Sequence, residues 1–154
     1  LALTASTPGN GCVRVIPGTH EGPAYEHKET YDEKNLLARG QTIETIDNSS
    51  AVDLTLKAGQ FSCHHERIVH GSAGNNTDTM RIGVGIFYFP AHVRSTIGRR
   101  SASLVRGFDE HGHWDADPVP TTDRDAEVYE LVRAAGERYV DPQFAQEAAR
   151  IVGK

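Results

Sequence analysis

The chain has 154 residues, of which 38% are hydrophobic and 24% are charged, and its formal net charge is −5. This is the length of one domain, and a compact domain of that size would bury roughly 70% of its unfolded surface. The acidic balance argues against a nucleic acid or an anionic membrane as the main partner, which leaves small molecules as the better prediction.

Cysteine usage and the first residues bear on where the protein works and on its completeness. Cys12 and Cys63 are too few for a disulfide framework or a four-cysteine zinc site, and the chain has no segment that resembles a signal peptide. We therefore predict reduced thiols in a cytoplasmic protein. Residues 1–4 alternate like a strand already under way, so we expect a fragment of a longer protein.

Short apolar runs separated by Gly, Pro and Asn fill the first hundred residues, and their β-branched and aromatic side chains favour strands. We predict strands near residues 1–4, 12–16, 41–46, 52–56, 60–63, 68–70 and 81–89. The turn Lys57-Ala58-Gly59-Gln60 is short enough for a hairpin. The polar residues 20–40 are predicted to be a long loop with a helical turn near residues 32–38.

The last third of the chain is basic at first and then helical. Arginines are concentrated after Pro90 and form either a solvated face or a contact for an anionic substrate; they are Arg94, Arg99, Arg100 and Arg106. From Thr122 onward, apolar residues at 128, 131 and 132 recur at helical spacing, which predicts a helix. Asp141 before Pro142 predicts a second short helix through residue 151, with Asp at its N-cap.

Residues 59–89 contain side chains whose types and spacing indicate a binding site. His70 ends one predicted strand and Arg81 begins the next, so an antiparallel hairpin would bring an imidazole and a guanidinium to the same end of a sheet. A neutral imidazole is a good iron(II) ligand, and a site of two histidines and one carboxylate leaves positions open for a 2-oxo acid and dioxygen. An arginine fork would then bind the far carboxylate of 2-oxoglutarate.

Three motifs in this chain together match the pattern of one known family. His70-Gly71-Ser72, followed by Asn75-Asn76-Thr77 and Arg81-Ile82-Gly83, resembles the motif around the distal iron ligand of the phytanoyl-CoA dioxygenase family. Asn10-Gly11-Cys12 with Ile16-Pro17-Gly18-Thr19-His20 resembles the signature that precedes it in that family. Residues 104–114 are similar to the tail of bacterial members, so the resemblance to the C-terminal portion of such a protein covers nearly residues 1–120.

The resemblance implies a fold, an activity and three site residues. By it, His70 is an iron(II) ligand, and Arg81 and the Ser72 hydroxyl hold the C5 carboxylate of the cosubstrate 2-oxoglutarate. It implies a dioxygenase that hydroxylates a small or carrier-linked metabolite. It also implies an incomplete, mainly β domain over residues 1–120, a double-stranded β-helix or cupin-like jelly roll, followed by a helical extension over residues 121–154.

The resemblance supplies only one of the three iron ligands. The family's His-x-Asp pair lies before the strand with which this sequence begins, so we expect this chain alone to be inactive. We also expect it to pair with its missing N-terminal half or with another copy of itself. Related halogenases replace that Asp by a small residue, so a halogenase is one alternative function, and a non-catalytic jelly-roll binding module is another.

Other histidines and the tryptophan have structural explanations that we favour over functional ones. Adjacent residues of a strand point to opposite faces, so at most one of His64 and His65 shares the side of His70; a regular strand would place His65 on the other face, and a bulge would change that. The spacing of His111 and His113 is used by metal sites, but a structural role is favoured. Trp114 is predicted to pack in a core or a lid.

Overall fold

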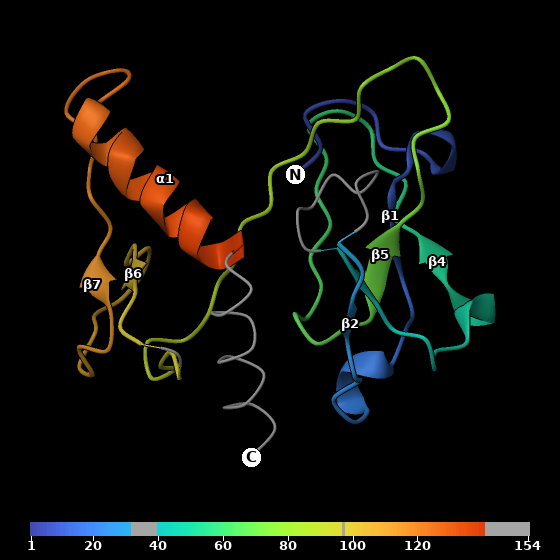
Figure 1. Ribbon diagram of the computed structural model, residues 1–154, viewed down its shortest axis with the longest axis horizontal. Coiled ribbons are helices and arrows are strands. Elements are labelled where there is room, and N and C mark those ends of the chain that lie inside the picture. Colours follow the sequence, from blue (N-terminus) through green and yellow to red (C-terminus); the bar gives the residue numbers. More distant parts are fainter. Residues whose placement is uncertain (32–39, 97, 141–154) are drawn as a thin grey trace. The chain divides into compact units, whose positions relative to one another are not determined.

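The computed structural model describes residues 1–31, 40–96 and 98–140. The chain divides into two compact units, unit 1 at Leu1–Phe87 and unit 2 at Tyr88–Lys154. In Figure 1 unit 1 runs from blue to green, and unit 2 follows through yellow to red. Most of the regular elements among the described residues are short strands, there is one α-helix, and these residues contain no closed barrel.

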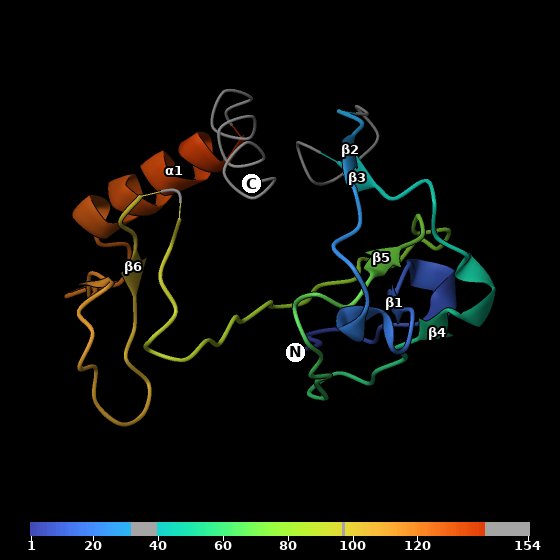
Figure 2. The same cartoon turned by 90° about the horizontal axis from the view of Figure 1, so that it is seen from below.

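Unit 1 is built from short strands and three single turns of 3-10 helix. Its elements are η1 (Pro8–Asn10), β1 (Val13–Val15), η2 (Thr19–Glu21), β2 (Lys28–Glu29), β3 (Gln41–Thr42), η3 (Asn48–Ser50), β4 (Val52–Asp53) and β5 (His70–Ser72). An antiparallel sheet has the order β4-β1-β5, with β1 in the middle (Figure 1). β2 and β3 form a separate antiparallel pair and lie side by side in Figure 2.

The central segment of unit 1, residues 1–16, is hydrogen-bonded along both of its sides. On one side Ser6 and Leu56 exchange backbone N–H to C=O bonds of 2.8 and 2.9 Å. On the other side the Leu3 N–H donates to the Ile82 carbonyl at 2.9 Å, and the Val84 N–H donates to the Leu1 carbonyl at 2.9 Å. The buried side chains among the described residues all belong to this segment: Ala2, Ser6, Asn10, Cys12, Val15 and Ile16.

A tight turn bends the central segment before β1, and two residues explain it. The buried Asn10 side chain accepts a hydrogen bond from the Thr7 N–H at 2.7 Å and donates one to the Ala5 carbonyl at 2.9 Å. Gly11 follows at φ +75°, a left-handed conformation that favours glycine. A Cβ atom there would lie 2.4 Å from the Ala73 carbonyl oxygen. Gly11 therefore lets two distant stretches of backbone approach each other.

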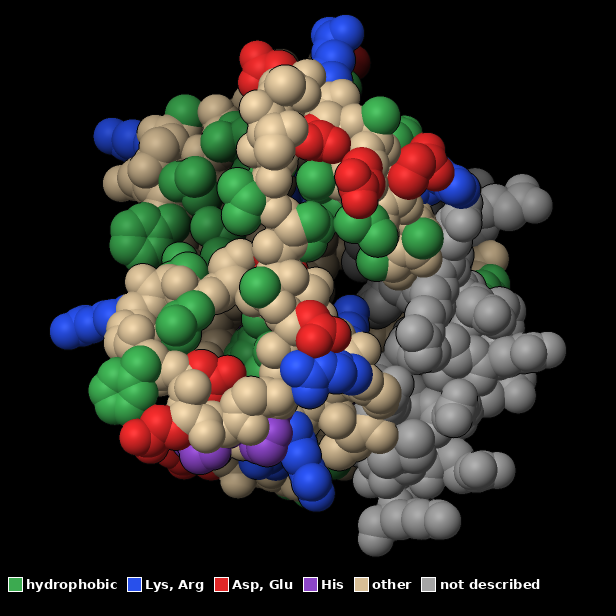
Figure 3. Space-filling view, turned by 90° about the vertical axis from the view of Figure 1, so that its left-hand side faces the viewer, with side chains coloured by type: hydrophobic (Ala, Val, Ile, Leu, Met, Phe, Trp, Pro, Cys, Tyr) green, Lys and Arg blue, Asp and Glu red, His purple; other side chains and the backbone are tan. Residues whose placement is uncertain are grey.

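Unit 2 contains β6 (Ser101–Ala102), β7 (Asp115–Ala116) and α1 (Ala126–Val140). β6 and β7 pair in parallel. Asp125 caps α1, since its carboxylate accepts the N–H groups of Glu127 and Val128 at 3.1 and 3.3 Å. Figure 3 shows hydrophobic side chains exposed on one face of the molecule; exposed apolar residues of unit 2 include Leu104, Val105, Phe108 and Val119.

Several predicted elements are confirmed. β1 lies within the strand predicted over residues 12–16, and α1 within the helix predicted after Thr122. The turn at residues 57–60 is present, with the Gln60 N–H donating to the Lys57 carbonyl at 3.1 Å. The predicted turn over residues 32–38 and the helix over residues 141–151 lie outside the described residues. Along the described chain, no helix is both long and apolar enough to cross a membrane.

Other predictions were wrong. Residues 20–40 are not one loop, because β2 pairs with β3. Residues 60–63 form no strand, so the turn at 57–60 closes no hairpin, and the Gln60 carbonyl accepts from the Ala2 N–H instead. Residues 81–89 form only an isolated bridge at Gly83. A ladder needs a neighbouring strand, and beyond Val84 no described segment pairs with this run, which leaves Ile86 and Phe87 exposed.

Candidate functional site

Strand pairing brings the two recognised signature motifs together. In the β1–β5 ladder, Val15 lies opposite His70 and Val13 lies opposite Ser72. Just beyond the ladder, Gly11 of the first motif packs against the Ala73 backbone. The motif at residues 10–20 and the motif that begins at His70 are therefore neighbours in space, although about fifty residues separate them in the sequence.

The protonation of the His70 ring is fixed by its hydrogen bond. Nδ1 lies 2.8 Å from the Ile68 carbonyl oxygen. Because a carbonyl can only accept, Nδ1 must carry the proton, which leaves the lone pair of Nε2 available in the neutral ring. The His70 residue is exposed. These are the properties that a metal-binding imidazole requires.

The rings of the two adjacent histidines have different neighbours, but residues 61–69 form no strand, so the alternation on which the prediction rested is absent. The His64 ring is 5.4 Å from that of His70, and the His65 ring is 5.7 Å from that of His20. Burial lowers the pKa of His64, and the neighbouring His70 lowers it further. His65 Nδ1 accepts the Arg67 N–H at 3.1 Å, so a neutral His65 carries its proton on Nε2. This makes His65 a poor metal ligand in the observed arrangement.

Arg81 is placed by a different neighbour from the one expected. The predicted hairpin between β5 and the Arg81 segment is wrong, because β5 pairs with β1 and the Arg81 segment lies along residues 1–4. The Thr4 hydroxyl donates to the Met80 carbonyl at 3.1 Å and accepts from the Ile82 N–H at 2.8 Å. One hydroxyl therefore holds the backbone on both sides of Arg81.

The Arg81 side chain is half-buried, and its charge reaches the core of unit 1. Burial raises the pKa of the Cys12 thiol, and the carboxylate of Asp53 raises it further. The positive charges of Arg81 and Arg14 act in the opposite direction on the same pKa. Cys12 directly precedes β1, and of the β5 residues it is Ser72, opposite Val13, that lies at this end of β1.

His-x-Asp and His-x-Glu spacings do occur in this chain, although not at the position that the family uses. They are His27–Glu29, His64–Glu66 and His113–Asp115. The structure gives two of the carboxylates other partners: Glu29 accepts from Gln41 at 2.9 Å, and Asp115 pairs with Arg99. In residues 1–31, 40–96 and 98–140, no three His, Cys, Asp or Glu side chains converge on a possible metal position.

The histidines of unit 2 pack against one another. The His111 and His113 rings stack at 5.5 Å, and the His92 ring lies edge-on to His111 at 6.3 Å. The Asp109 carboxylate accepts the N–H groups of His111 and Gly112 at 2.8 and 3.2 Å. The His111 bond is the main cause that lowers the pKa of Asp109. The carboxylate thus shapes the turn that carries the two stacked rings.

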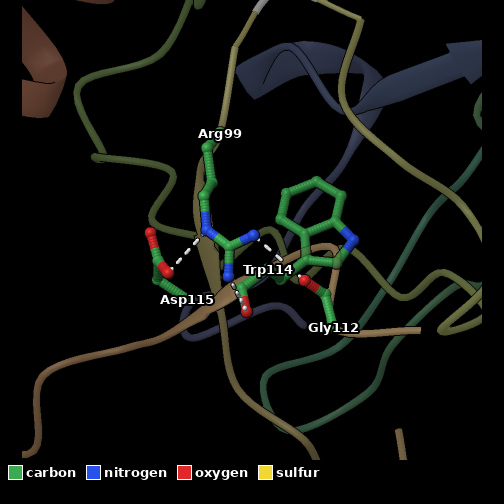
Figure 4. A network of polar contacts seen from close by, with 4 residues as sticks. All are labelled: Arg99, Gly112, Trp114 and Asp115. Atoms are coloured by element: carbon green, nitrogen blue, oxygen red, sulfur yellow. Dashed lines mark hydrogen bonds and ion pairs between the residues drawn. The ribbon is translucent and has the colours of Figure 1, made fainter. Parts of the chain in front are cut away.

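Arg99 joins β7 to the turn before it, as Figure 4 shows. Its Nε donates to an Asp115 carboxylate oxygen at 2.7 Å, and its terminal nitrogens donate to the carbonyls of Gly112 and Trp114 at 3.0 and 3.4 Å. The Trp114 ring packs 4.5 Å from Phe89, and its N–H donates to the Val93 carbonyl at 2.7 Å. Trp114 thus packs against Phe89, its place in a core or a lid stays a prediction, and Arg99 is engaged in structure.

Comparison with known proteins identifies the family. The family model described as Phytanoyl-CoA dioxygenase (PhyH) matches residues 1–83, more than half of the 154 residues. The chain belongs to this family. The match includes β1, β5 and the segment that carries Arg81, and it ends before residues 104–114, for which the resemblance to bacterial tails stays a prediction.

Individual relatives agree with that assignment. The chain is 30% identical over 98 residues to a probable alpha-ketoglutarate-dependent hypophosphite dioxygenase of Stutzerimonas stutzeri, an alignment that covers 62% of this chain and 34% of that protein. It is 30% identical over 84 residues to the peroxisomal phytanoyl-CoA dioxygenase of Bos taurus, covering 54% of this chain and 25% of that protein. The chain thus spans only a quarter to a third of these relatives.

A solved structure resembles the fold. The apo form of the non-heme monooxygenase ThoJ aligns with 96% of this chain and 53% of its own, with a TM-score of 0.71 and 33% sequence identity. Its nickel complex aligns with a TM-score of 0.64 and 29% identity. The chain therefore shares the fold of about half of a non-heme oxygenase.

Proposed function

We propose that this chain is part of an iron(II)/2-oxoglutarate-dependent dioxygenase that hydroxylates a small or carrier-linked metabolite. The observation that carries the proposal is the His70 ring, which is exposed, has Nδ1 engaged and Nε2 free, and lies on the strand paired with the other family motif. Membership of the phytanoyl-CoA dioxygenase family supports it.

In this proposal His70 contributes one ligand to an iron(II) ion. The donor chemistry fits, since a neutral imidazole whose Nδ1–H is held by a carbonyl is a common arrangement among metal-binding histidines. The bound iron would couple the reduction of dioxygen to the decarboxylation of 2-oxoglutarate and to the oxidation of a carbon. Among the described residues, no group of three His, Cys, Asp or Glu side chains could hold a metal ion. We therefore propose that other parts of the whole protein supply the remaining iron ligands.

Arg81 and Ser72 are proposed to bind the distal carboxylate of 2-oxoglutarate. A guanidinium stays charged at every relevant pH and can donate two parallel hydrogen bonds to a carboxylate, and a hydroxyl can donate a third. Ser72 is exposed on β5, and the Thr4 hydroxyl fixes the backbone at Arg81. Partial burial of Arg81 would strengthen such a pair by reducing its exposure to water.

We further propose that the whole fold is a jelly roll, of which these strands form one part. The exposed apolar residues at 82, 84, 86 and 87 support further strands beside them, either from the missing half or from another copy. The likeness to one half of ThoJ supports the same view. Size-exclusion chromatography with light scattering would separate a self-associated chain from a monomer.

The proposal is tested by cosubstrate binding to the full-length protein. Calorimetry with 2-oxoglutarate, under anaerobic conditions with iron(II), should give at least about a 100-fold loss of affinity in Arg81→Ala, because a charge-assisted double hydrogen bond is removed. Arg14→Ala is the matched control: it also removes an arginine near Cys12, but one paired with Asp53 at 2.8 Å. Undiminished binding in Arg81→Ala would refute the anchor.

Metal binding gives a second, separate test. An iron(II) titration should lose its high-affinity site in His70→Ala and keep it in His27→Ala. His27 is the matched control because its Nδ1 also lies near a backbone carbonyl of unit 1, that of Tyr25, at 2.9 Å. Succinate formation against a panel of metabolites would then identify the substrate, and chlorinated products would identify the halogenase alternative. The cytoplasmic location stays a prediction that cell fractionation would check.

A further inference from the structure

The Thr19 hydroxyl joins the turn of the first family motif to the strand that carries His70. It donates to the Ile16 carbonyl at 2.7 Å and accepts the Val69 N–H at 2.8 Å. The Ile16 N–H in turn donates to the Val69 carbonyl at 2.9 Å. Thr19 opens η2 and is half-buried, so these bonds are partly shielded from water.

The group that Thr19 holds is the same group that holds the His70 ring. The Val69 N–H and the Ile68 C=O belong to one peptide unit, which is planar and rigid. The Thr19 oxygen binds the N–H end of this unit, and the C=O end accepts the proton on His70 Nδ1 at 2.8 Å. A change in the tilt of this one plane would alter both bonds together.

We propose that Thr19 is a positioning residue for His70, and that its hydroxyl acts through the Ile68–Val69 peptide to keep Nδ1 protonated and Nε2 free. The role in metal binding rests on the proposed function of His70. The effect on the imidazole tautomer does not, and it can be measured without metal.

The polarity of the bonds supports the proposal. The two inner groups of the series both accept and donate: the Ile68–Val69 peptide accepts from His70 and donates to Thr19, and Thr19 in turn donates to Ile16. Hydrogen bonds arranged head to tail in this way strengthen one another by about 10–30% each. Stronger donation from Nδ1 makes Nε2 a more basic ligand.

Other contacts in this region allow the hydroxyl to be removed without loss of the turn. A terminal nitrogen of Arg67 donates to the Gly22 carbonyl at 2.7 Å, and the rings of His20 and His65 pack at 5.7 Å. These contacts join the same two stretches of chain. We therefore expect Thr19→Val, which keeps the shape of the side chain and removes its hydroxyl, to fold.

The decisive experiment is nitrogen-15 NMR of the histidine rings in the full-length, metal-free protein, at a pH where His70 is neutral. The wild type should show His70 protonated on Nδ1 alone. Thr19→Val should show a mixture of the two tautomers, and Thr19→Ser should restore the wild-type state. A wild-type ring protonated on Nε2 would overturn the proposal without any variant.

Metal titration then tests the role in binding, with nickel(II) as a redox-inactive probe. Thr19→Val should bind it more weakly than the wild type, but by less than the about 10–100-fold loss that removing the direct partner of a metal-binding histidine causes, because the Ile68 carbonyl stays. Thr4→Val is the matched control, because it also loses a hydroxyl that bridges two segments by two hydrogen bonds. It should leave the His70 tautomer unchanged.

The outcomes separate this inference from the proposed function. If His70→Ala still binds nickel(II) as the wild type does, the metal role of His70 fails, while the tautomer measurement still decides whether Thr19 positions the ring. If His70→Ala abolishes binding but Thr19→Val changes neither affinity nor tautomer, the proposed role of Thr19 is wrong. A tautomer shift in Thr4→Val as large as that in Thr19→Val would also contradict it.

Discussion

Each of the two compact units is stabilised by its own kind of internal contact. In unit 1, backbone groups far apart in the sequence pair with each other, as Leu1 does with Val84, 83 residues away. In unit 2, side chains do more of this work: Arg99 binds two carbonyls and a carboxylate, and the Trp114 ring packs on Phe89. All buried side chains in the described chain belong to unit 1.

This difference bears on where a site can be built. A backbone framework fixes the position of a residue largely independently of its side chain, so functional side chains can project from it without supporting the fold. His70 and Ser72 do so from β5. In unit 2 the charged and aromatic side chains themselves maintain the structure, which leaves fewer of them available for chemistry.

The first prediction uses a natural probe in each unit. Cys12 lies in unit 1 with 1% exposure and a pKa raised by burial, whereas Trp114 is the single tryptophan and lies in unit 2. A thiol reagent should label Cys12 at least about 100-fold more slowly than Cys63, because labelling requires unit 1 to open. With increasing denaturant, Trp114 fluorescence should change before Cys12 becomes reactive. Coincident transitions would show that the units unfold together.

The backbone contact at Gly11 should be the most sensitive single position of unit 1. Gly11→Ala combines a left-handed φ of +75° with a contact of 2.4 Å to the Ala73 carbonyl oxygen, and we expect a loss of about 3 kcal/mol or more. Gly59→Ala is the control, with φ +83° and no atom within 4 Å, and should cost about 1–2 kcal/mol. Urea unfolding measures both, and equal losses would show that the close approach contributes nothing.

The side-chain network of unit 2 should respond less strongly. Arg99→Ala removes three partners but from an exposed position, so we expect the free energy of unfolding to fall by about 1 kcal/mol. Arg133→Ala is a comparison within α1, where Arg133 binds Glu130 at the same 2.7 Å. A larger loss in Arg133→Ala, measured by Trp114 fluorescence in denaturant, would contradict the importance of the network.

The smallest effect concerns pH and the start of α1. The Thr121 N–H, followed by the Val128 N–H, holds the pKa of Asp125 below its ordinary value. A carboxylate whose pKa is lower in the folded than in the unfolded state stabilises the folded state when it is charged. This stabilisation of α1 is complete above the unfolded pKa near 4, and it is lost as the pH falls through the lower folded pKa. Circular dichroism should therefore show helix loss on acidification. Asp125→Asn should lack this component, while Asp123→Asn should retain it.

The sequence supports the local elements better than their pairings. β1 follows from its β-branched residues, and α1 from apolar residues at helical spacing. Each of these signals lies within a few neighbouring residues, which is why a pattern along the chain can predict it.

Pairings depend on residues that no local pattern connects. The Arg81 segment lies along residues 1–4 rather than along β5, and β2 was missed because two polar residues carry no strand signal. Thr19 was counted only as part of a motif, since its partner Val69 is fifty residues away. The roles assigned to His70, Ser72 and Arg81 stay predictions until ligand binding is measured.

The passage between the two units has a practical consequence for dissecting the protein. Unit 1 ends at Phe87 and unit 2 begins at Tyr88. Phe87 is 84% exposed and Tyr88 is 73% exposed. Two accessible aromatic residues in an unpaired stretch of backbone are a favourable cleavage point for a protease of chymotrypsin-like specificity. Brief digestion of this chain by itself should therefore cut here early, and mass spectrometry of the products would locate the cut.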